Sequence, residues 1–202
     1  MRPIGAERYP VPVARPKEFD PDEALERALE RFWADGYEAT SMQDLTAAMG
    51  VGRRSLYDTF GSKHELYLRA LDRYGERNAL VAPLARPGPV KPLLREVLAS
   101  VCAEALQDAE RRGCFFVNAA IERGARDGEV DRRTRAAFDA VREALATAVA
   151  RGQSQGEIAR GRDPEEVADF LLTVIQGLRV VGKAMPDRER LEAAVDAALA
   201  PL

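Results

Sequence analysis

The sequence predicts an all-α protein, and three observations support that prediction. Apolar side chains recur every three to four residues along most of the chain, which is the spacing of one buried helix face. Aspartate followed by proline opens two of these patterns, at Asp20-Pro21 and Asp163-Pro164, as is typical of a helix start. Only 6% of the residues are aromatic, and runs of β-branched residues are rare, which disfavours strands.

Length, composition and cysteine usage narrow the class of protein. At 202 residues, of which 46% are hydrophobic, the chain can bury the core of one medium-sized domain or two small ones. Two cysteines without a CxxC pair, and the lack of a secretory leader, predict a reducing, cytoplasmic environment. No apolar run approaches the roughly 20 residues of a membrane-spanning helix, so we expect no contact with a membrane.

Histidine and cysteine are too scarce for the common metal and catalytic sites. One histidine, His64, and two separated cysteines cannot supply the usual nitrogen and sulfur ligands of zinc. The sequence also shows no Ser-His-Asp or Cys-His arrangement. We therefore expect no metal, no cofactor and no enzymatic activity. His64 itself is expected at the surface or close to a phosphate.

Residues 1–19 are expected to form an extended arm. Pro3, Pro10, Pro12 and Pro16 disfavour a helix there, and four basic residues outnumber two acidic ones. A basic arm can reach the phosphates or the minor groove of DNA. The alternative is a tail without a role, as chain termini often are.

Residues 20–35 are predicted to form the first helix, with Asp20 as its N-cap and Gly36 at its end. Its apolar stripe includes Phe32 and Trp33. We expect both rings to lie in the core rather than to contact a ligand, because the helix must brace the two short helices that follow.

Those two short helices are joined by a tight glycine turn. Thr40-Ser41 offers an N-cap hydroxyl for the first helix, and Gly50 can end it in a left-handed conformation. In the second helix, apolar residues face inward, and arginine, serine and tyrosine side chains face outward. The arrangement fits a helix-turn-helix whose second helix enters the DNA major groove. An ordinary helical hairpin with a solvated polar face fits the same pattern.

The stretch from Ala28 to Leu71 resembles the DNA-binding domain of the TetR/AcrR family of bacterial transcriptional regulators. The matching elements stand in fixed register: Phe32, Gly36-Tyr37, Thr40-Ser41, Leu45, Gly50-Val51, Leu56-Tyr57, Phe60, Ser62-Lys63 and Leu66. The sequence departs from the family pattern at Gly52, where serine is usual. Gly52 is expected to weaken the N-cap of the recognition helix.

Eight residues are candidates for contact with DNA. By their chemistry, Arg53 and Arg54 can bind guanine bidentately or grip phosphate, and Ser55 is short enough to touch a base edge or a thymine methyl. The resemblance implies a DNA contact for one further polar residue and phosphate contacts for four others. These are Gln43 for the first role and Ser41, Tyr57, Thr59 and Lys63 for the second. For each of the eight, a merely solvated side chain is the alternative.

The charge balance of the whole chain argues mildly against nucleic acid, because its formal net charge is -3. The distribution of charge matters more than the sum. Between Gly50 and Arg69 four basic residues stand against two acidic ones, so the surface around the second short helix is locally positive.

The remaining chain predicts a series of helices, about nine in all. A helix from Ser62 to about Leu80 opens with a capping box between Ser62 and Glu65, and prolines make residues 82–89 a loop. Further helices are expected over residues 90–105, from residue 113 and up to Gly152, with a turn at residues 126–129. Two closing helices open at Asp163 and Pro186.

The resemblance implies two domains after the arm: a DNA-binding domain at residues 20–66 and a ligand-binding and dimerisation domain at residues 67–202. The two closing helices carry more apolar surface than one neighbour can cover, which suggests a pairing surface. In the family, the corresponding helices form a two-fold interface, so the operator is expected to be a near-palindrome. Alternatively, the two helices complete the core of the monomer.

The same resemblance implies a small-molecule effector bound in the C-terminal domain. The candidate lining residues are Cys102, Cys114, Phe115, Phe116, Asn118, Phe138 and Gln176. Ordinary core packing is the alternative for each. A sharper hypothesis makes Cys114 an electrophile-sensitive thiol, because unpaired amides at a helix N-terminus stabilise a thiolate. Its alternative is a buried, inert cysteine.

The sequence therefore predicts a homodimeric transcriptional repressor that binds a palindromic DNA operator and is released by a small molecule. The alternative is a small-molecule-binding or protein-interaction helical module that has weak or lost DNA binding, which the acidic net charge and Gly52 favour. An all-α enzyme lacks any catalytic constellation.

Overall fold

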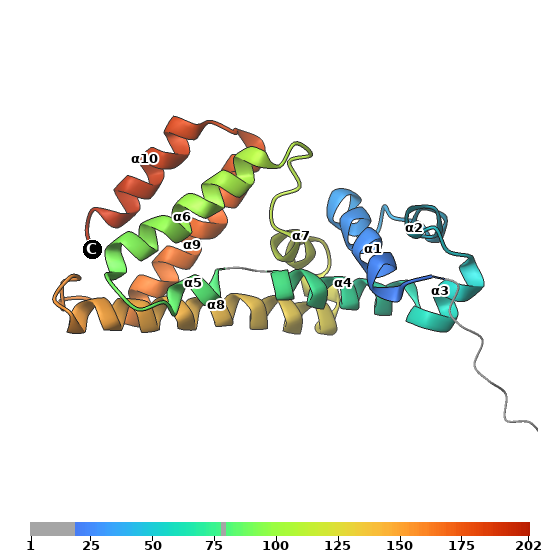
Figure 1. Cartoon of the computed structure of the whole chain (residues 1–202), viewed down its shortest axis with the longest axis horizontal. Helices are drawn as coiled ribbons and strands as arrows, with labels where there is room; N and C mark the ends of the chain where they lie inside the picture. Colours follow the sequence, from blue (N-terminus) through green and yellow to red (C-terminus); the bar gives the residue numbers. More distant parts are fainter. Residues whose placement is uncertain (1–18, 78–79) are drawn as a thin grey trace, which may run out of the picture.

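A computed structural model describes residues 19–77 and 80–202, and this part of the chain contains ten α-helices, one short 3₁₀ turn and no strand. The predicted all-α class is confirmed (Figure 1). One helix, α5, is a single turn, so the nine longer helices match the expected number. Most of the predicted N-terminal arm, residues 1–18, lies outside the described residues.

The first four helices pack around aromatic side chains of α1 and α4. Their bounds are α1 (Pro21–Asp35), α2 (Met42–Met49), α3 (Arg53–Phe60) and α4 (Lys63–Arg77). Asp20 Oδ1 accepts hydrogen bonds from the amides of Asp22 and Glu23 at 2.8 and 3.4 Å, so the predicted cap of α1 is present. Phe32 is fully buried, as predicted. Trp33 is only half-buried and packs against the edge of this core.

The turn between α2 and α3 forms as the sequence indicates. Ser41 Oγ accepts from the Asp44 amide at 3.1 Å, and the Asp44 carboxylate accepts from the Ser41 amide at 2.9 Å, which completes a capping box. Gly50 ends α2 with φ of 68° in the left-handed region that favours glycine. Gly52 precedes α3 and supplies no side-chain cap, as expected.

The predicted helix over residues 62–80 is shorter in the structure. α4 ends at Arg77, residues 78 and 79 lie outside the described part, and α5 (Val81–Leu84) forms one turn inside the predicted loop. Pro83 does not prevent this turn, because a single turn leaves its first amides unpaired in any case. Only half of the predicted capping box is present: Ser62 Oγ accepts from the Glu65 amide at 3.1 Å.

The C-terminal part of the chain is built from five longer helices, of which α8 is the longest. Their bounds are α6 (Val90–Gln107), α7 (Phe115–Glu122), α8 (Gly128–Ser154), α9 (Pro164–Ala184) and α10 (Arg188–Leu199), with the 3₁₀ turn η1 at Gly124–Arg126. The predicted turn at residues 126–129 therefore lies about two residues too late, because η1 begins at Gly124 and α8 already begins at Gly128. In Figure 1, α3 lies at one end of the molecule and α10 at the other.

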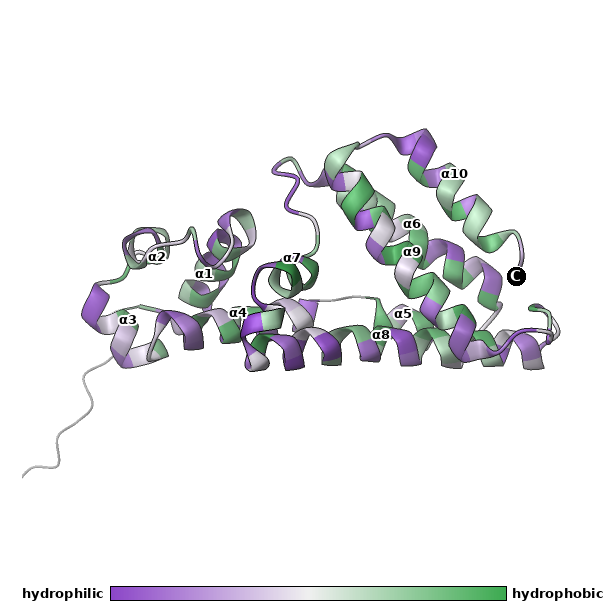
Figure 2. Cartoon of the chain, turned by 180° about the vertical axis from the view of Figure 1, so that it is seen from behind, coloured by the Kyte–Doolittle hydropathy of each residue, from purple (hydrophilic) through white to green (hydrophobic). Residues whose placement is uncertain are grey.

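Two hydrophobic cores result, and α7 belongs to the first. One core joins α1–α4 to Phe115, Phe116 and Val130, and the other joins α5, α6, α8, α9 and α10. Figure 2 shows the corresponding hydrophobic residues gathered on α7 and on α6 and α9. Because the first core spans α4 and α7, the boundary between residues 66 and 67 stays a prediction. None of the described helices is long and apolar enough to cross a membrane.

Candidate DNA interface and effector cavity

The exposed face of α3 carries three of the candidate DNA-binding side chains. Leu56 and Phe60 are buried in the first core, which turns Arg53, Arg54 and Tyr57 outward. The Arg54 side chain is 95% exposed, and the Tyr57 residue is 40% exposed. The helix therefore presents cations and a phenol to solvent at one end of the molecule.

The partners of these arginines are weak. The guanidinium carbon of Arg53 lies 5.8 Å from the centre of the Tyr57 ring. Arg54 Nε lies 3.8 Å from a carboxylate oxygen of Asp58. Exposed pairs of this kind contribute little to stability and can be exchanged for other partners. Both guanidinium groups are thus available for bases or phosphates.

The other five candidates differ in their surroundings. Gln43 is exposed, whereas Ser55 and Thr59 of α3 are half-buried. Ser41 is engaged in the α2 cap, which leaves its hydroxyl less free for a phosphate. Lys63 Nζ lies 4.3 Å above the Tyr37 ring.

Sequence reasoning left Arg69 out of the candidate set. Its guanidinium carbon lies 5.5 Å from the centre of the Phe60 ring, and its Nη1 donates to the Thr59 carbonyl oxygen at 3.4 Å. An exposed cation therefore stands beside the C-terminal end of α3. The local excess of basic residues was the only sequence signal for it.

A cluster of polar contacts, here called the junction cluster, joins the α1–α2 corner and α4 to α7 and α8. It consists of Tyr37, Glu38, His64, Glu122, Arg123 and Asp127. Both carboxylate oxygens of Glu122 accept backbone amides, from Tyr37 and Glu38, each at 2.9 Å. Arg123 pairs with Glu38 and with Asp127, and lies 4.5 Å from the Tyr37 ring.

The corner requires glycine. Gly36 has φ of 85°, and a Cβ there would lie 3.0 Å from Glu122 Oε2. His64, predicted at the surface or near a phosphate, has a side chain that is 37% exposed, and its Nε2 lies 2.8 Å from the Asp127 carboxylate. Burial alone would raise the pKa of Asp127, but hydrogen bonds from Arg123, His64 and the Val130 amide lower it below its ordinary value.

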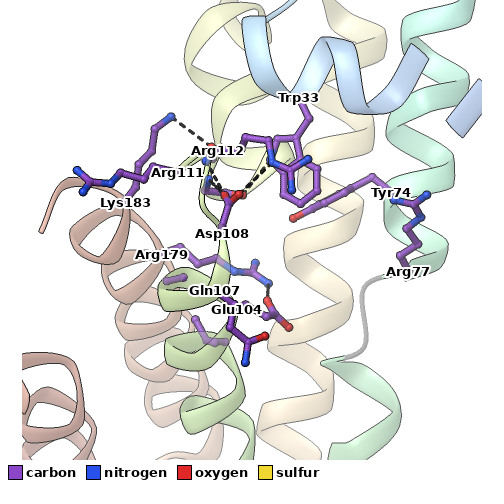
Figure 3. Close-up of a pocket in the computed structure, with 13 residues that line it drawn as sticks. Trp33, Tyr74, Arg77, Glu104, Gln107, Asp108, Arg111, Arg112, Arg179 and Lys183 are labelled. Carbon is purple, nitrogen blue, oxygen red and sulfur yellow. Dashed lines mark hydrogen bonds and ion pairs between the residues drawn. The ribbon is translucent and has the colours of Figure 1, made fainter. Parts of the chain in front are cut away.

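A cavity of about 390 Å³ lies between α1, α4, α6, the α6–α7 loop and α9 (Figure 3). Trp33 and Tyr74 form one wall, with ring centres 5.1 Å apart in an edge-to-face arrangement. Trp33 Nε1 donates to the Gly113 carbonyl oxygen at 2.9 Å, so α1 is tied to the α6–α7 loop at the cavity. The volume falls at the small end of the range for ligand sites.

None of the seven predicted effector residues lines this cavity. Phe115 and Phe116 pack against Tyr67 and Tyr74 of α4 in the first core. Asn118 Nδ2 donates to the Arg112 carbonyl oxygen at 2.9 Å. Their roles in binding an effector stay predictions.

The remaining four have distinct surroundings. Cys114 is 3% exposed, and its Sγ lies 3.4 Å from Nη1 of Arg179. Cys102 is also buried, which raises the pKa of its thiol. Phe138 is partly buried beside the first core, and Gln176 Oε1 is buried without a hydrogen-bond partner in the described part of the chain. Burial and the adjacent Cys114 raise the pKa of Tyr74.

Comparison with known proteins decides the family. Residues 24–70 match the bacterial regulatory proteins of the tetR family, and residues 87–198 match the tetracyclin repressor-like C-terminal domain. The chain belongs to the TetR family of bacterial regulatory proteins. It is accordingly a DNA-binding transcriptional regulator, and α2 and α3 are its helix-turn-helix.

Individual relatives of this TetR family regulator span nearly its whole length. It is 36% identical over 194 residues to YezE, an uncharacterized HTH-type transcriptional regulator of Bacillus subtilis (strain 168), which covers 94% of this chain and 100% of YezE. It is 30% identical over 180 residues to the HTH-type transcriptional repressor ComR of Escherichia coli (strain K12), covering 88% and 86% of the two chains.

A solved structure supports the same assignment. A cysteine mutant of the TetR family transcriptional regulator CifR, complexed with 26bp double-strand operator DNA, matches with a TM-score of 0.82 and 35% identity, over 92% of this chain and 98% of that one. The fold of this TetR family regulator is thus the fold of a regulator solved on its operator.

Proposed function

We propose that this protein is a homodimeric repressor that occupies a near-palindromic operator and leaves it when a small molecule binds its C-terminal part. The observation that carries the proposal is the outer face of α3, where Arg53, Arg54 and Tyr57 are exposed and have only weak partners. The operator complex of CifR and the repressor ComR support a DNA-binding role of this kind.

The dimer forms through α9 and α10 in this proposal. Phe170 and Val180 of α9 are 44% and 51% exposed, and an apolar hollow beside Phe170 is lined from both helices. Exposed apolar side chains gathered on one face in this way are typical of a protein–protein interface. Two-fold pairing there presents two copies of α3 to one duplex, so an inverted repeat is the matching DNA sequence.

Regulation, rather than catalysis, is the activity we assign, and we place it in the cytoplasm, where a bacterial regulator meets its DNA. The second candidate is a ligand-binding or protein-interaction module with weak DNA binding. The observation in its favour is Gly52, because α3 begins without a side-chain cap.

Salt titration of a promoter fragment separates the two candidates. The fragment is taken from upstream of the protein's own gene, and its affinity is measured at several salt concentrations. A repressor gives a steep decline of affinity with salt, and Lys63→Ala or Arg53→Ala reduces the slope by about 1 for each phosphate that the variant no longer neutralises. Weak binding with a flat slope favours the interaction module.

The matched control is Arg135→Ala. Arg135 is an exposed arginine of α8 that pairs with Asp131, away from α3. Its replacement removes the same charge, so the slope of this variant must equal that of the wild type. Equal reductions of the slope in Arg135→Ala and Arg53→Ala would show only a nonspecific charge effect and would refute the role of α3.

A further inference from the structure

The cavity beside Trp33 holds an excess of positive charge. Five of its lining residues are basic and two are acidic, in a chain whose formal net charge is -3. The basic residues are Arg77, Arg111, Arg112, Arg179 and Lys183, and the acidic ones are Glu104 and Asp108. Gathering partly buried cations is unfavourable unless anions compensate them, so the pairing of each one matters.

Some of these cations are already neutralised. Arg112 pairs with Glu30 of α1 and with Asp108, at 3.1 Å from the latter. Burial alone would lower the pKa of Arg112, but hydrogen bonds to Asp108 and Glu30 raise it, so the group stays charged. Arg77 pairs with Glu30 as well. These groups hold the cavity walls together.

Arg179 and Lys183 are less completely compensated. Arg179 is 8% exposed, yet its nearest carboxylate oxygen, of Glu104, is 3.7 Å away. Lys183 has no carboxylate oxygen within 4.0 Å among the described residues, and its Nζ donates to the Arg112 carbonyl oxygen at 3.2 Å. The two lie one turn apart on α9 and face the same cavity (Figure 3).

The opposite wall is aromatic. Trp33 is half-buried, and Tyr74 reaches from α4 towards the middle of the cavity in Figure 3. The cavity therefore pairs a cationic side with an aromatic side. A flat ligand can lie against the rings while its charge meets α9.

We propose that the cavity binds a small aromatic carboxylate, whose carboxylate contacts Arg179 and Lys183 and whose ring packs against Trp33 and Tyr74. The inference rests on the proposed function, because it names the chemical class of the effector. The volume of about 390 Å³ suits a ligand of one or two rings.

The same contacts link the cavity to the DNA-binding helices. Trp33 lies on α1, its Nε1 donates to Gly113, and the Arg112 guanidinium carbon lies 4.0 Å from the centre of its ring. A carboxylate that takes the ammonium of Lys183 removes one of the two donors to the Arg112 carbonyl oxygen, leaves only Asn118 Nδ2, and so loosens the α6–α7 loop. The loop then holds α1 less tightly, so ligand and operator favour different arrangements.

Trp33 is the only tryptophan of the chain, so its fluorescence reports binding directly. The full-length protein is titrated, without DNA, with benzoate, phenylacetate and cinnamate, and with the primary amide of each acid. We expect a saturable change in Trp33 emission for at least one acid and binding at least about tenfold weaker for its amide.

Variants locate the carboxylate. Lys183→Gln and Arg179→Gln are each expected to weaken the binding of the acid at least about tenfold. Arg142→Gln, which removes a half-buried arginine of α8 that pairs with Glu165 and Asp169 outside the cavity, must leave the affinity for the acid unchanged. Lys183 is exposed, so its variant folds even where Arg179→Gln does not.

Three results overturn the inference. They are that no acid gives a saturable change in Trp33 emission up to millimolar concentration, that an amide binds as tightly as its acid, or that Lys183→Gln binds the acid as tightly as the wild type does. All three leave the repressor proposal standing, because no DNA is present. A protein that binds the acid but never binds the promoter fragment supports the inference and refutes the repressor. An acid that binds without weakening the operator complex overturns the loop mechanism.

Discussion

Replacement of Glu122 by glutamine tests the contact that fixes the helix-turn-helix to the rest of the molecule. The two carboxylate oxygens of Glu122 accept the amides of Tyr37 and Glu38, which lie 85 and 84 residues away in the chain. Glutamine keeps the shape but replaces one oxygen by an NH₂ group. One backbone donor then faces another donor, and the remaining hydrogen bond loses its ionic partner.

The size of the effect follows from the two bonds. A hydrogen bond to a charged group contributes about 1.5–3 kcal/mol, and a neutral one about 1 kcal/mol. The Glu38 amide is solvent-exposed, which reduces its share. We therefore expect Glu122→Gln to lower the free energy of unfolding by about 2 kcal/mol.

Urea unfolding, followed by circular dichroism at one fixed protein concentration, measures the change, since the stability of a dimer depends on concentration. Glu143→Gln is the control, because Glu143 is exposed on α8 and makes no hydrogen bond or ion pair among the described residues. A Glu122→Gln protein within about 0.5 kcal/mol of that control would refute the reasoning, since this is the range of ordinary surface substitutions.

Three further substitutions test other parts of the structure. Asp127→Asn is expected to destabilise the protein at pH 5 and less so at pH 3. The lowered pKa of Asp127 stabilises the folded protein at pH values above the ordinary pKa of about 3.9, and this stabilisation is lost as the pH falls through the lower pKa of the folded state. A loss of unfolding free energy that is the same at both pH values, measured by urea unfolding, would contradict this. Gly182→Ala places a Cβ 2.6 Å from the Ala105 Cβ between α6 and α9, so we expect the free energy of unfolding, measured by thermal unfolding, to fall by about 1–3 kcal/mol. Gly128→Ala, whose Cβ meets nothing within 4 Å, is expected to be tolerated. Phe170→Glu is expected to give a monomer in light scattering, whereas Ile121→Glu, which changes an 81% exposed residue of α7, leaves a dimer; two dimers would exclude the α9 face as the interface.

Local sequence signals predicted the first three helices closely. The caps at Asp20 and Ser41, the left-handed Gly50 and the inward Leu56 and Phe60 all depend on residues within one turn of one another. Such short-range rules carry over directly from sequence to structure. The outward placement of Arg53 and Arg54 follows from them.

The cavity was harder to predict, because it depends on where distant segments meet. Trp33 has the spacing of a core residue, but it lies at the edge of the α1 stripe, where the α6–α7 loop happens to leave space. Phe115 and Phe116 are as apolar as a ligand site requires, yet the tyrosines of α4 cover them. Arg179 and Lys183 showed a spacing of four residues, but only the fold turns that face of α9 towards α1.

Selection of DNA from a random pool by the wild-type protein tests the central claim most directly. If paired subunits insert their α3 helices into successive major grooves, the enriched duplexes carry an inverted repeat with half-site centres about 10–10.5 bp apart, or a multiple of that spacing. Enrichment of a motif without two-fold symmetry, or no enrichment at all, would contradict the claim.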